Sequence, residues 1–254
     1  HDVLDTEEGT VSNEAIEESL YALAGVGTVV VDDAGVSIAT YRYMEKWLRQ
    51  FFQKRCISRY ATGVTPEKAE AFIARSQQYL GFEFSSDQKN VIRHIAAGQS
   101  RVYSLLGYAG TGKSTISRAI LDFLSENYCR REDMVCCAFT GMAAMRIKKL
   151  TGYDSYTIHT LLKYQGENQF VYNKDNRLPH RVILLDEASM VNLPLFYRLA
   201  QAIADDALFI MVGDPAQLPP IGAGNVFCDI TSDPHFPKTV LTTIYRQGED
   251  SVLV

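Results

Sequence analysis

Apolar residues in the first 82 positions recur at helical spacing, interrupted by two short runs typical of strands. The expected elements are a helix over residues 13–23, strands over residues 27–32 and 36–39 joined by a turn, an amphipathic helix over residues 41–60, and a helix capped by Thr65 with Pro66 at its first position. The amphipathic helix carries an apolar stripe of Met44, Trp47, Leu48, Phe51 and Phe52, a spacing more typical of a core than of a binding face. The pattern predicts a small α+β module over residues 1–82 with a helix-hairpin-helix-like arrangement. A wing-like module is one form that this arrangement can take.

From residue 83 onward, short apolar strands alternate with amphipathic helices. Strands are expected over residues 102–106, 134–139, 181–185 and 207–212, and helices over residues 114–124, 141–150, 193–203 and from a cap at Ser85 or Ser86 to residue 97. This alternation predicts a parallel sheet covered by helices on both faces. Ligands of such sheets bind at the carboxyl ends of the strands. We therefore expect an α/β domain over residues 83–254.

A glycine-rich segment follows the first of these strands. Residues 107–114 contain the complete pattern G-x-x-x-x-G-K-[ST] between a predicted strand and a predicted helix. In such a loop the backbone N–H groups surround phosphates, Lys113 reaches the β- and γ-phosphates, and the Ser114 hydroxyl takes a place on Mg²⁺. A glycine-rich turn that matches by chance is the alternative, but the flanking elements favour a nucleotide. The expected binding residues are Gly107, Tyr108, Ala109, Gly110, Thr111, Gly112, Lys113, Ser114 and Thr115.

Two later strands also end in polar residues. The strand over residues 181–185 runs into Asp186, which can hold Mg²⁺ or its waters, and Glu187, which can orient and deprotonate an attacking water. The strand over residues 207–212 runs into a loop that contains Gln217, whose side chain can reach the γ-phosphate and transmit its presence. An acidic pair at a strand end is common, and a proline-rich turn is the alternative for the second loop. The roles given to Asp186, Glu187 and Gln217 are favoured because a phosphate-binding loop is expected in the same sheet.

The formal net charge of −5 first argues against a polyanionic partner. Seven acids and no Lys or Arg lie within residues 1–18, however, and without them 23 acids remain against 25 bases. The body of the chain is therefore near neutral, so nucleic-acid binding would require local patches. The candidates are Arg146, Lys148 and Lys149, and then Lys174, Arg177, His180 and Arg181. Solvated charged faces are the alternative for both clusters.

The 254 residues are 46% hydrophobic and 22% charged, which is typical of a globular protein with a substantial core. No apolar run reaches membrane-spanning length. The five cysteines are odd in number and contain no C-x-x-C pair, which favours reduced thiols in a cytoplasmic protein.

Six motifs occur in the order GYAGTGKST, AFTGMAA, TIHTLL, LLDEASM, GDPAQLPPIGAG and IYRQ. In these motifs and their spacing the chain resembles the superfamily 1B helicases of the RecD/TraA type over about residues 84–247. The resemblance implies a RecA-like P-loop NTPase fold, ATP and Mg²⁺ as cofactors, 5′→3′ movement along single-stranded DNA, and duplex unwinding. The alternative function is an ATPase switch or nucleotide-binding scaffold that acts on protein partners without moving on DNA.

The resemblance also implies roles for single residues. Gln88 matches the glutamine that reads the adenine edge, and Tyr245 matches a residue that stacks on the base. The residues that match groups acting on the transferring phosphoryl are Lys113, Glu187, Gln217 and Arg246; those matching Mg²⁺ ligands are Ser114 and Asp186; those matching contacts to single-stranded DNA are Thr140, Gly141 and His159. Plain surface roles for Gln88 and Arg246, and a structural role for His159, are the alternatives.

The chain departs from the family pattern at two positions. Phe139 replaces the usual Pro, and Met142 replaces a Lys that would offer a phosphate contact; we expect Phe139 in the core rather than stacked on a base. Residues 169–172 could form one arm of a hairpin that turns at residues 173–176, where related motors split the duplex, but the segment is short and a surface loop is favoured. Family members continue into a second motor domain, so we expect this piece to bind nucleotide weakly and not to unwind DNA.

Overall fold

The computed structural model describes residues 12–32, 35–167 and 169–245, and the chain divides into two compact units, residues 1–49 and 50–254. In the first unit, helix α1 (Asn13–Gly25) begins after Ser12, whose hydroxyl accepts a hydrogen bond from the backbone N–H of Ala15. Strands β1 (Val29–Asp32) and β2 (Gly35–Ile38) pair antiparallel. The predicted helix and hairpin are therefore confirmed, while turn residues Asp33 and Ala34 lie outside the described residues.

Helix α2 (Ala39–Ile57) begins in the first unit and ends in the second, which contains a six-stranded sheet. The strand order is β10-β3-β9-β8-β4-β5, and every neighbouring pair is parallel. The strands are β3 (Val102–Gly107), β4 (Met134–Ala138), β5 (Ser155–Thr157), β8 (Val182–Asp186), β9 (Leu208–Gly213) and β10 (Lys238–Leu241). The helices are α3 (Pro66–Leu80), α4 (Ser86–Ala97), α5 (Lys113–Asn127), α6 (Gly141–Thr151), α7 (Ile158–Leu161), α8 (Leu193–Ala202) and α9 (Val226–Ser232).

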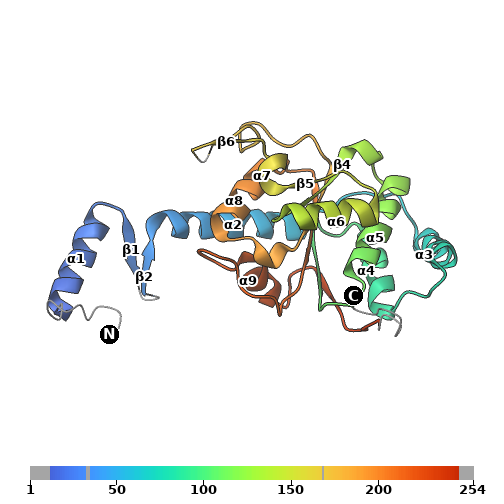
Figure 1. Cartoon of the computed structure of the whole chain (residues 1–254), viewed down its shortest axis with the longest axis horizontal. Helices are drawn as coiled ribbons and strands as arrows, with labels where there is room; N and C mark the ends of the chain where they lie inside the picture. The colour runs from blue at the N-terminus through green and yellow to red at the C-terminus, as the bar shows by residue number, and fades with distance from the viewer. Residues whose placement is uncertain (1–11, 33–34, 168, 246–254) are drawn as a thin grey trace, which may run out of the picture. The chain divides into compact units, whose positions relative to one another are not determined.

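Helices cover both faces of this sheet. Strands β3, β4 and β9 are buried at every position, as expected when neither face meets water. On one face, Tyr103 and Leu105 belong to a core that also contains apolar residues of α3, α4, α5 and α6. Figure 1 shows these four helices next to one another. On the other, the ring of Phe209 meets Phe196 of α8 at 6.2 Å and Phe51 of α2 at 6.4 Å between centroids. The predicted α/β architecture is confirmed.

In the second unit, helices begin directly after the cap residues that the sequence predicts. Thr65 caps α3, with Pro66 at the first position. Of the two serines considered for α4, Ser85 is the cap: its hydroxyl accepts from Gln88 N, and Ser85 N donates in turn to Gln88 Oε1. This reciprocal pair satisfies two backbone N–H groups that a helix start otherwise leaves free. Gln88 is therefore fixed at the start of α4.

Some elements differ from the prediction. The sequence pattern did not reveal β5, β10, α7 or α9. The loop favoured over residues 169–176 was wrong in part, because β6 (Tyr164–Gly166) and β7 (Gln169–Phe170) form a short antiparallel hairpin. The hairpin turns before residue 169, and residues 173–176 form a separate turn in which the Asn173 side chain accepts from Asp175 N.

Helix α3 lies in the larger unit, where Phe72 packs against Phe123 of α5 at 5.1 Å between ring centroids. The compact units thus divide at residues 49 and 50, whereas the sequence placed a boundary at residues 82 and 83. The boundary at residues 82 and 83, where one predicted domain would end and the next begin, stays a prediction.

Among the residues that the structure describes, no helix is long and apolar enough to cross a membrane. All five cysteines are described and are free thiols; Cys129, Cys136 and Cys137 are buried. Burial raises the pKa of the Cys136 thiol to about 12, so it stays protonated at neutral pH. These thiols act as small apolar side chains of the core.

Candidate functional site

The glycine-rich loop joins β3 to α5 at the carboxyl edge of the sheet. Gly110 and Gly112 have φ of +81° and +80°, in the left-handed region that favours glycine. Gly107 has a different reason, because a side-chain carbon there would collide with the Thr111 hydroxyl. Thr111 is buried and its hydroxyl donates to the Tyr108 carbonyl at 2.8 Å, which holds the loop closed. Backbone and side chains together produce the loop that the motif predicts.

The Lys113 ammonium lies over this loop. Its Nζ donates to the carbonyls of Gly107 at 2.5 Å and Tyr108 at 3.0 Å, and stands 3.7 Å from Asp214 Oδ2. Asp214 is only 7% exposed and follows β9, the strand beside β3. Asp214 is not among the residues singled out from the sequence above. An acid directly after a strand of a parallel sheet was the signal that could have identified it as an ion-pair partner of the lysine.

Asp186 and Glu187 form a pair of adjacent acids at the end of β8. Burial, and then the charge of Glu187, raise the pKa of Asp186 to about 6, while Arg146 and Lys113 oppose that rise. Glu187 has φ of +53°, a conformation that is uncommon for residues other than glycine and is often found at functional sites. Arg146, predicted as part of a surface patch on α6, thus contributes its charge to the acidic pair.

The Gln217 side chain connects the loops after β8 and β9. Its Nε2 donates to Glu187 Oε2 at 2.8 Å, and its Oε1 accepts from Ser189 Oγ at 2.9 Å. The loop is fixed at its far end, where Asn192 Nδ2 donates to the Ile221 carbonyl at 3.0 Å and Leu193 N donates to the Ala223 carbonyl at 2.8 Å. The proline-rich loop is therefore more than a turn, since it positions an amide on the acid.

Gln88 and Tyr245 lie together beside the phosphate loop. Tyr245 Oη donates to Gln88 Oε1 at 2.8 Å, and Tyr245 N donates to the Gly110 carbonyl at 3.0 Å. Gln88 is buried, which excludes the plain surface role considered for it. Arg246 lies outside the described residues, so its role stays a prediction.

The residues predicted to contact DNA follow the strands β4 and β5. Thr140 and Gly141 lie at the start of α6, and the Thr140 hydroxyl accepts from Ala143 N at 3.2 Å as the helix cap. His159 is exposed on α7, with its ring 5.6 Å from Tyr164 and 6.1 Å from Phe170 of the hairpin. Phe139 is half-buried and Met142 is 85% exposed. These residues share the carboxyl edge of the sheet with the phosphate loop.

The chemistry of the loop and acids fits a nucleotide with a divalent cation. Among the described residues, no group of three or more His, Cys, Asp or Glu is placed to hold a metal ion by itself. Mg²⁺ commonly takes one or two carboxylates and completes its shell with phosphate oxygens and water. Asp186, with its raised pKa, and the hydroxyl of Ser114 in the first turn of α5 are donors of that kind. The residues present therefore fit the pair of ligands that the loop implies.

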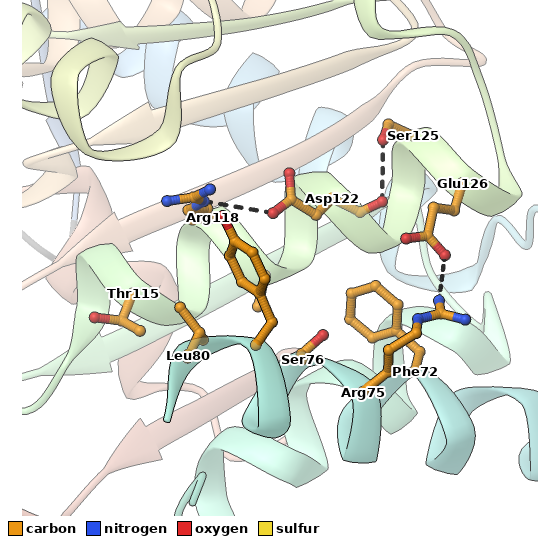
Figure 2. Close-up of a pocket in the computed structure, with 11 residues that line it drawn as sticks. Phe72, Arg75, Ser76, Leu80, Thr115, Arg118, Asp122, Ser125 and Glu126 are labelled. Carbon is orange, nitrogen blue, oxygen red and sulfur yellow. Dashed lines mark hydrogen bonds and ion pairs between the residues drawn. The ribbon is translucent and has the colours of Figure 1, made fainter. Parts of the chain in front are cut away.

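A separate hollow of about 340 Å³ lies between α3 and α5 (Figure 2). Thr115, the last residue of the predicted phosphate-binding set, is among its lining residues. Arg118 stands 3.5 Å from Asp122, and Arg75 stands 2.6 Å from Glu126, so each arginine in the hollow already has an acidic partner (Figure 2). The hollow thus differs from the strand-end site, where Lys113 stands 3.7 Å from Asp214 and its charge also acts on Asp186.

The fold and the loop define an α/β domain with a phosphate-binding loop. Residues 83–253 match the sequence model of the AAA domain family, and the chain belongs to that family. It is 34% identical over 170 residues to the ATP-dependent RecD2 DNA helicase of Deinococcus radiodurans, an alignment that covers 67% of this chain and 23% of that protein. The resemblance to RecD- and TraA-type helicases that the motifs indicated is confirmed.

Other similar proteins lie in the same group. The probable conjugal transfer protein TraA of Sinorhizobium fredii is 33% identical over 192 residues, covering 74% of this chain and 16% of that protein. The chain therefore spans less than a quarter of either relative. A crystal structure of the Pif1 helicase from Bacteroides in complex with ADP-AlF3 and ssDNA is 24% identical with a TM-score of 0.42, covering 65% of this chain and 43% of that one. A likeness of this size supports no further conclusion.

Proposed function

We propose that this chain contains the first motor domain of an ATP-dependent DNA helicase, preceded by an N-terminal module. The observation that carries the proposal is the hydrogen bond from Gln217 to Glu187, at 2.8 Å, beside the phosphate loop on the neighbouring strand. An amide on the acid that would act on water is a means of linking the state of the phosphates to the rest of the protein. The named relatives, an ATP-dependent DNA helicase and a conjugal transfer protein, support a role on DNA.

In this proposal the loop residues bind and orient the nucleotide. The N–H groups at the start of α5 face the phosphates, and Lys113 exchanges its two carbonyl acceptors for phosphate oxygens. Asp186 and Ser114 hold Mg²⁺, which supplies positive charge to the phosphates when bound. A cation beside Asp186 would also lower its raised pKa and keep it ionised.

Glu187 and Gln217 then act on the attacking water. The Glu187 carboxylate holds the water in line for attack and accepts a proton from it, while Gln217 keeps that carboxylate in place. Arg246 is proposed to stabilise charge on the transferring phosphoryl group. Gln88 is proposed to read an edge of the base, and Tyr245 to stack on the base once its hydroxyl has left Gln88. Glu187 directly follows β8, and the loop that carries Gln217 follows the adjacent strand β9 and is fixed at its far end by Asn192 and Leu193.

Single-stranded DNA is the proposed partner. Thr140 and Gly141 would contact a phosphate, and the exposed His159 would stack on a base. In any longer protein that contains this chain, a second motor domain would complete the nucleotide site and support 5′→3′ movement and duplex unwinding. We also propose a cytoplasmic location, which the five free thiols support.

The test is ATP hydrolysis with and without a single-stranded oligonucleotide, in this chain and in a longer version with the flanking sequence. We expect Mg·ATP binding by the 254-residue chain and hydrolysis by the longer version that DNA stimulates at least tenfold. Hydrolysis that ignores DNA but responds to a protein partner would indicate an ATPase switch instead. Absence of ATP binding in both versions would contradict the assignment of the site.

A further inference from the structure

The amide of Gln88 has a fixed orientation and is closed off from water. The backbone N–H of Ser85 lies 3.1 Å from Gln88 Oε1 and can donate only to an oxygen, so the cap identifies which end of the amide is the carbonyl. Gln88 is 1% exposed. A ligand that approaches from solvent therefore does not reach this amide in the present arrangement.

Tyr245 is one of the residues that cover it. Its hydroxyl donates to Gln88 Oε1 at 2.8 Å and accepts from Ser85 N at 3.1 Å. A side-chain carbon placed on Gly112 would stand 2.6 Å from Gln88 Nε2 and 3.5 Å from Tyr245 Cε2, so the amide and the ring both lie against that glycine. The ring thus lies against the phosphate loop at Gly112, and its hydroxyl lies on the amide.

The segment that carries Tyr245 is attached at two places. Thr242 N and Thr242 Oγ1 donate to Asp87 Oδ2 at 3.0 and 2.7 Å, in the first turn of α4. At the other end, Tyr245 N donates to the carbonyl of Gly110 at 3.0 Å. That bond uses a carbonyl of the loop and none of the N–H groups that bind phosphate. The segment therefore closes the side of the loop next to Gln88 and leaves the phosphate-binding N–H groups free of Tyr245.

We propose that the Tyr245 phenol occupies the base subsite, so that a base must displace it from Gln88 before a nucleotide is fully bound. A nucleobase also has a hydrogen-bonding edge, so the Tyr245 hydroxyl and the base would compete for the same Gln88 amide. Phosphates alone would enter without moving the ring. Tyr245 then determines how far the site prefers a nucleoside triphosphate over a base-free polyphosphate. This inference depends on the proposed ATP site.

The experiment compares dissociation constants for Mg·ATP and for inorganic tripolyphosphate, by titration calorimetry on the 254-residue chain. Tyr245→Phe keeps the ring but removes both hydroxyl bonds, and Ser85 N still satisfies the Gln88 carbonyl. We expect this change to tighten ATP binding about three- to tenfold, the effect of about one net hydrogen bond, with tripolyphosphate binding within twofold of wild type. Tyr79→Phe, at a tyrosine of α3 that is 78% exposed, should change neither value.

A second variant keeps the inference testable if Tyr245→Phe folds poorly. Thr242→Ala removes one of the two bonds to Asp87 and should also tighten ATP but not tripolyphosphate. Unchanged or weaker ATP binding in both variants, or equal tightening of both ligands, would overturn the inference while the ATP site stands. A wild-type chain that binds neither ligand would overturn the proposed function and this inference with it.

Discussion

Gln217 donates a hydrogen bond from Nε2 to Glu187 Oε2 at 2.8 Å, which joins the loops that follow β8 and β9. The same amide accepts from Ser189 Oγ at 2.9 Å, so both of its ends are engaged. Glu187 has φ of +53°, and its side-chain direction therefore depends on an uncommon backbone conformation together with this one amide. The position of the acid is set from two strands at once.

The first prediction concerns this pair. Gln217→Ala removes the amide from Glu187, and we expect kcat for ATP hydrolysis to fall about 100-fold with the ATP dissociation constant within threefold of wild type. Glu187→Gln should slow hydrolysis at least as much and also spare binding. If the two residues act as one unit, the double variant should be little worse than Glu187→Gln alone.

The control for this pair is Ser189→Ala, which removes only the bond to Gln217 Oε1. It should cost much less activity than either change above. Fully additive losses in the double variant would show that Gln217 acts independently of Glu187, and a matching loss of ATP binding would contradict both assigned roles.

A second prediction concerns Lys113, which lies between the loop carbonyls and Asp214. Lys113→Ala removes the charge that would meet the phosphates, so we expect ATP affinity to fall at least tenfold and hydrolysis to become undetectable. The buried Asp214 would also lose its nearby cation, which should lower the free energy of unfolding by about 1–3 kcal/mol.

Lys68→Ala, at an exposed lysine of α3, is the matched control and should change neither property. Equilibrium unfolding in urea and nucleotide titration measure the two effects separately. Intact hydrolysis in the Lys113 variant would remove the assigned site altogether.

The sequence predicts the central strands of this sheet well, because a strand that is buried on both faces requires little beyond a run of apolar residues. Strands β3, β8 and β9 are five or six residues of mostly apolar side chains followed by a motif. Strand β10 reads Lys-Thr-Val-Leu and lies at the sheet edge with two half-buried residues at its start, so its pattern is hard to distinguish from a loop. Strand β5 is three residues long and has no periodicity to detect.

The sequence predicts which residues belong to the site, but it does not predict the contacts between them. Motif positions placed Lys113, Asp186, Glu187 and Gln217 at strand ends, and adjacent parallel strands bring such ends together. The closure of Gln88 by Tyr245 joins residues 157 positions apart, and no local pattern encodes it. The raised pKa of Asp186 likewise arises from burial among elements that the sequence does not position relative to one another.

A third prediction concerns His94 of α4, whose ring lies 4.5 Å from that of Tyr103 between centroids, tilted by 32°, and whose Nε2 is buried without a hydrogen-bond partner in the described part of the chain. Burial lowers the pKa of His94, so the unfolded chain takes up its proton near pH 6.5 while the folded chain does so only at lower pH. Acidification from pH 7 to pH 5 therefore favours the unfolded state. Asp186, whose pKa is raised to about 6, takes up a proton in the folded chain over this range and opposes the effect equally in wild type and variant. The change in the free energy of unfolding from pH 7 to pH 5 should therefore be less unfavourable in His94→Phe than in wild type.

Urea unfolding at both pH values measures this difference. His180, whose pKa burial also lowers, will keep part of the pH dependence in the variant. His235→Phe is the control, because that side chain is 93% exposed, and it should retain the wild-type loss. An equal loss in the His94 and wild-type chains would show that His94 does not contribute to acid sensitivity.

The last prediction separates two kinds of contact to single-stranded DNA. His159 is exposed beside Tyr164 and Phe170, where stacking on a base is worth about 1–3 kcal/mol. His159→Ala should therefore weaken binding of a single-stranded oligonucleotide at least fivefold without changing the dependence on salt. Lys149 is exposed on α6, the helix that Thr140 caps and Gly141 begins. A phosphate contact at Lys149 would release counterions. Lys149→Ala should lower the slope of log affinity against log salt concentration by about 0.7.

Fluorescence anisotropy at several salt concentrations measures both quantities on one set of samples. Lys54→Ala is the matched control, since Lys54 pairs with Asp205 at 2.7 Å, and it should alter neither affinity nor slope. Because stacking and counterion release respond differently to salt, a change in slope with His159→Ala would indicate that the ring binds phosphate rather than a base. An unchanged affinity in both variants would place the DNA on another face of the domain.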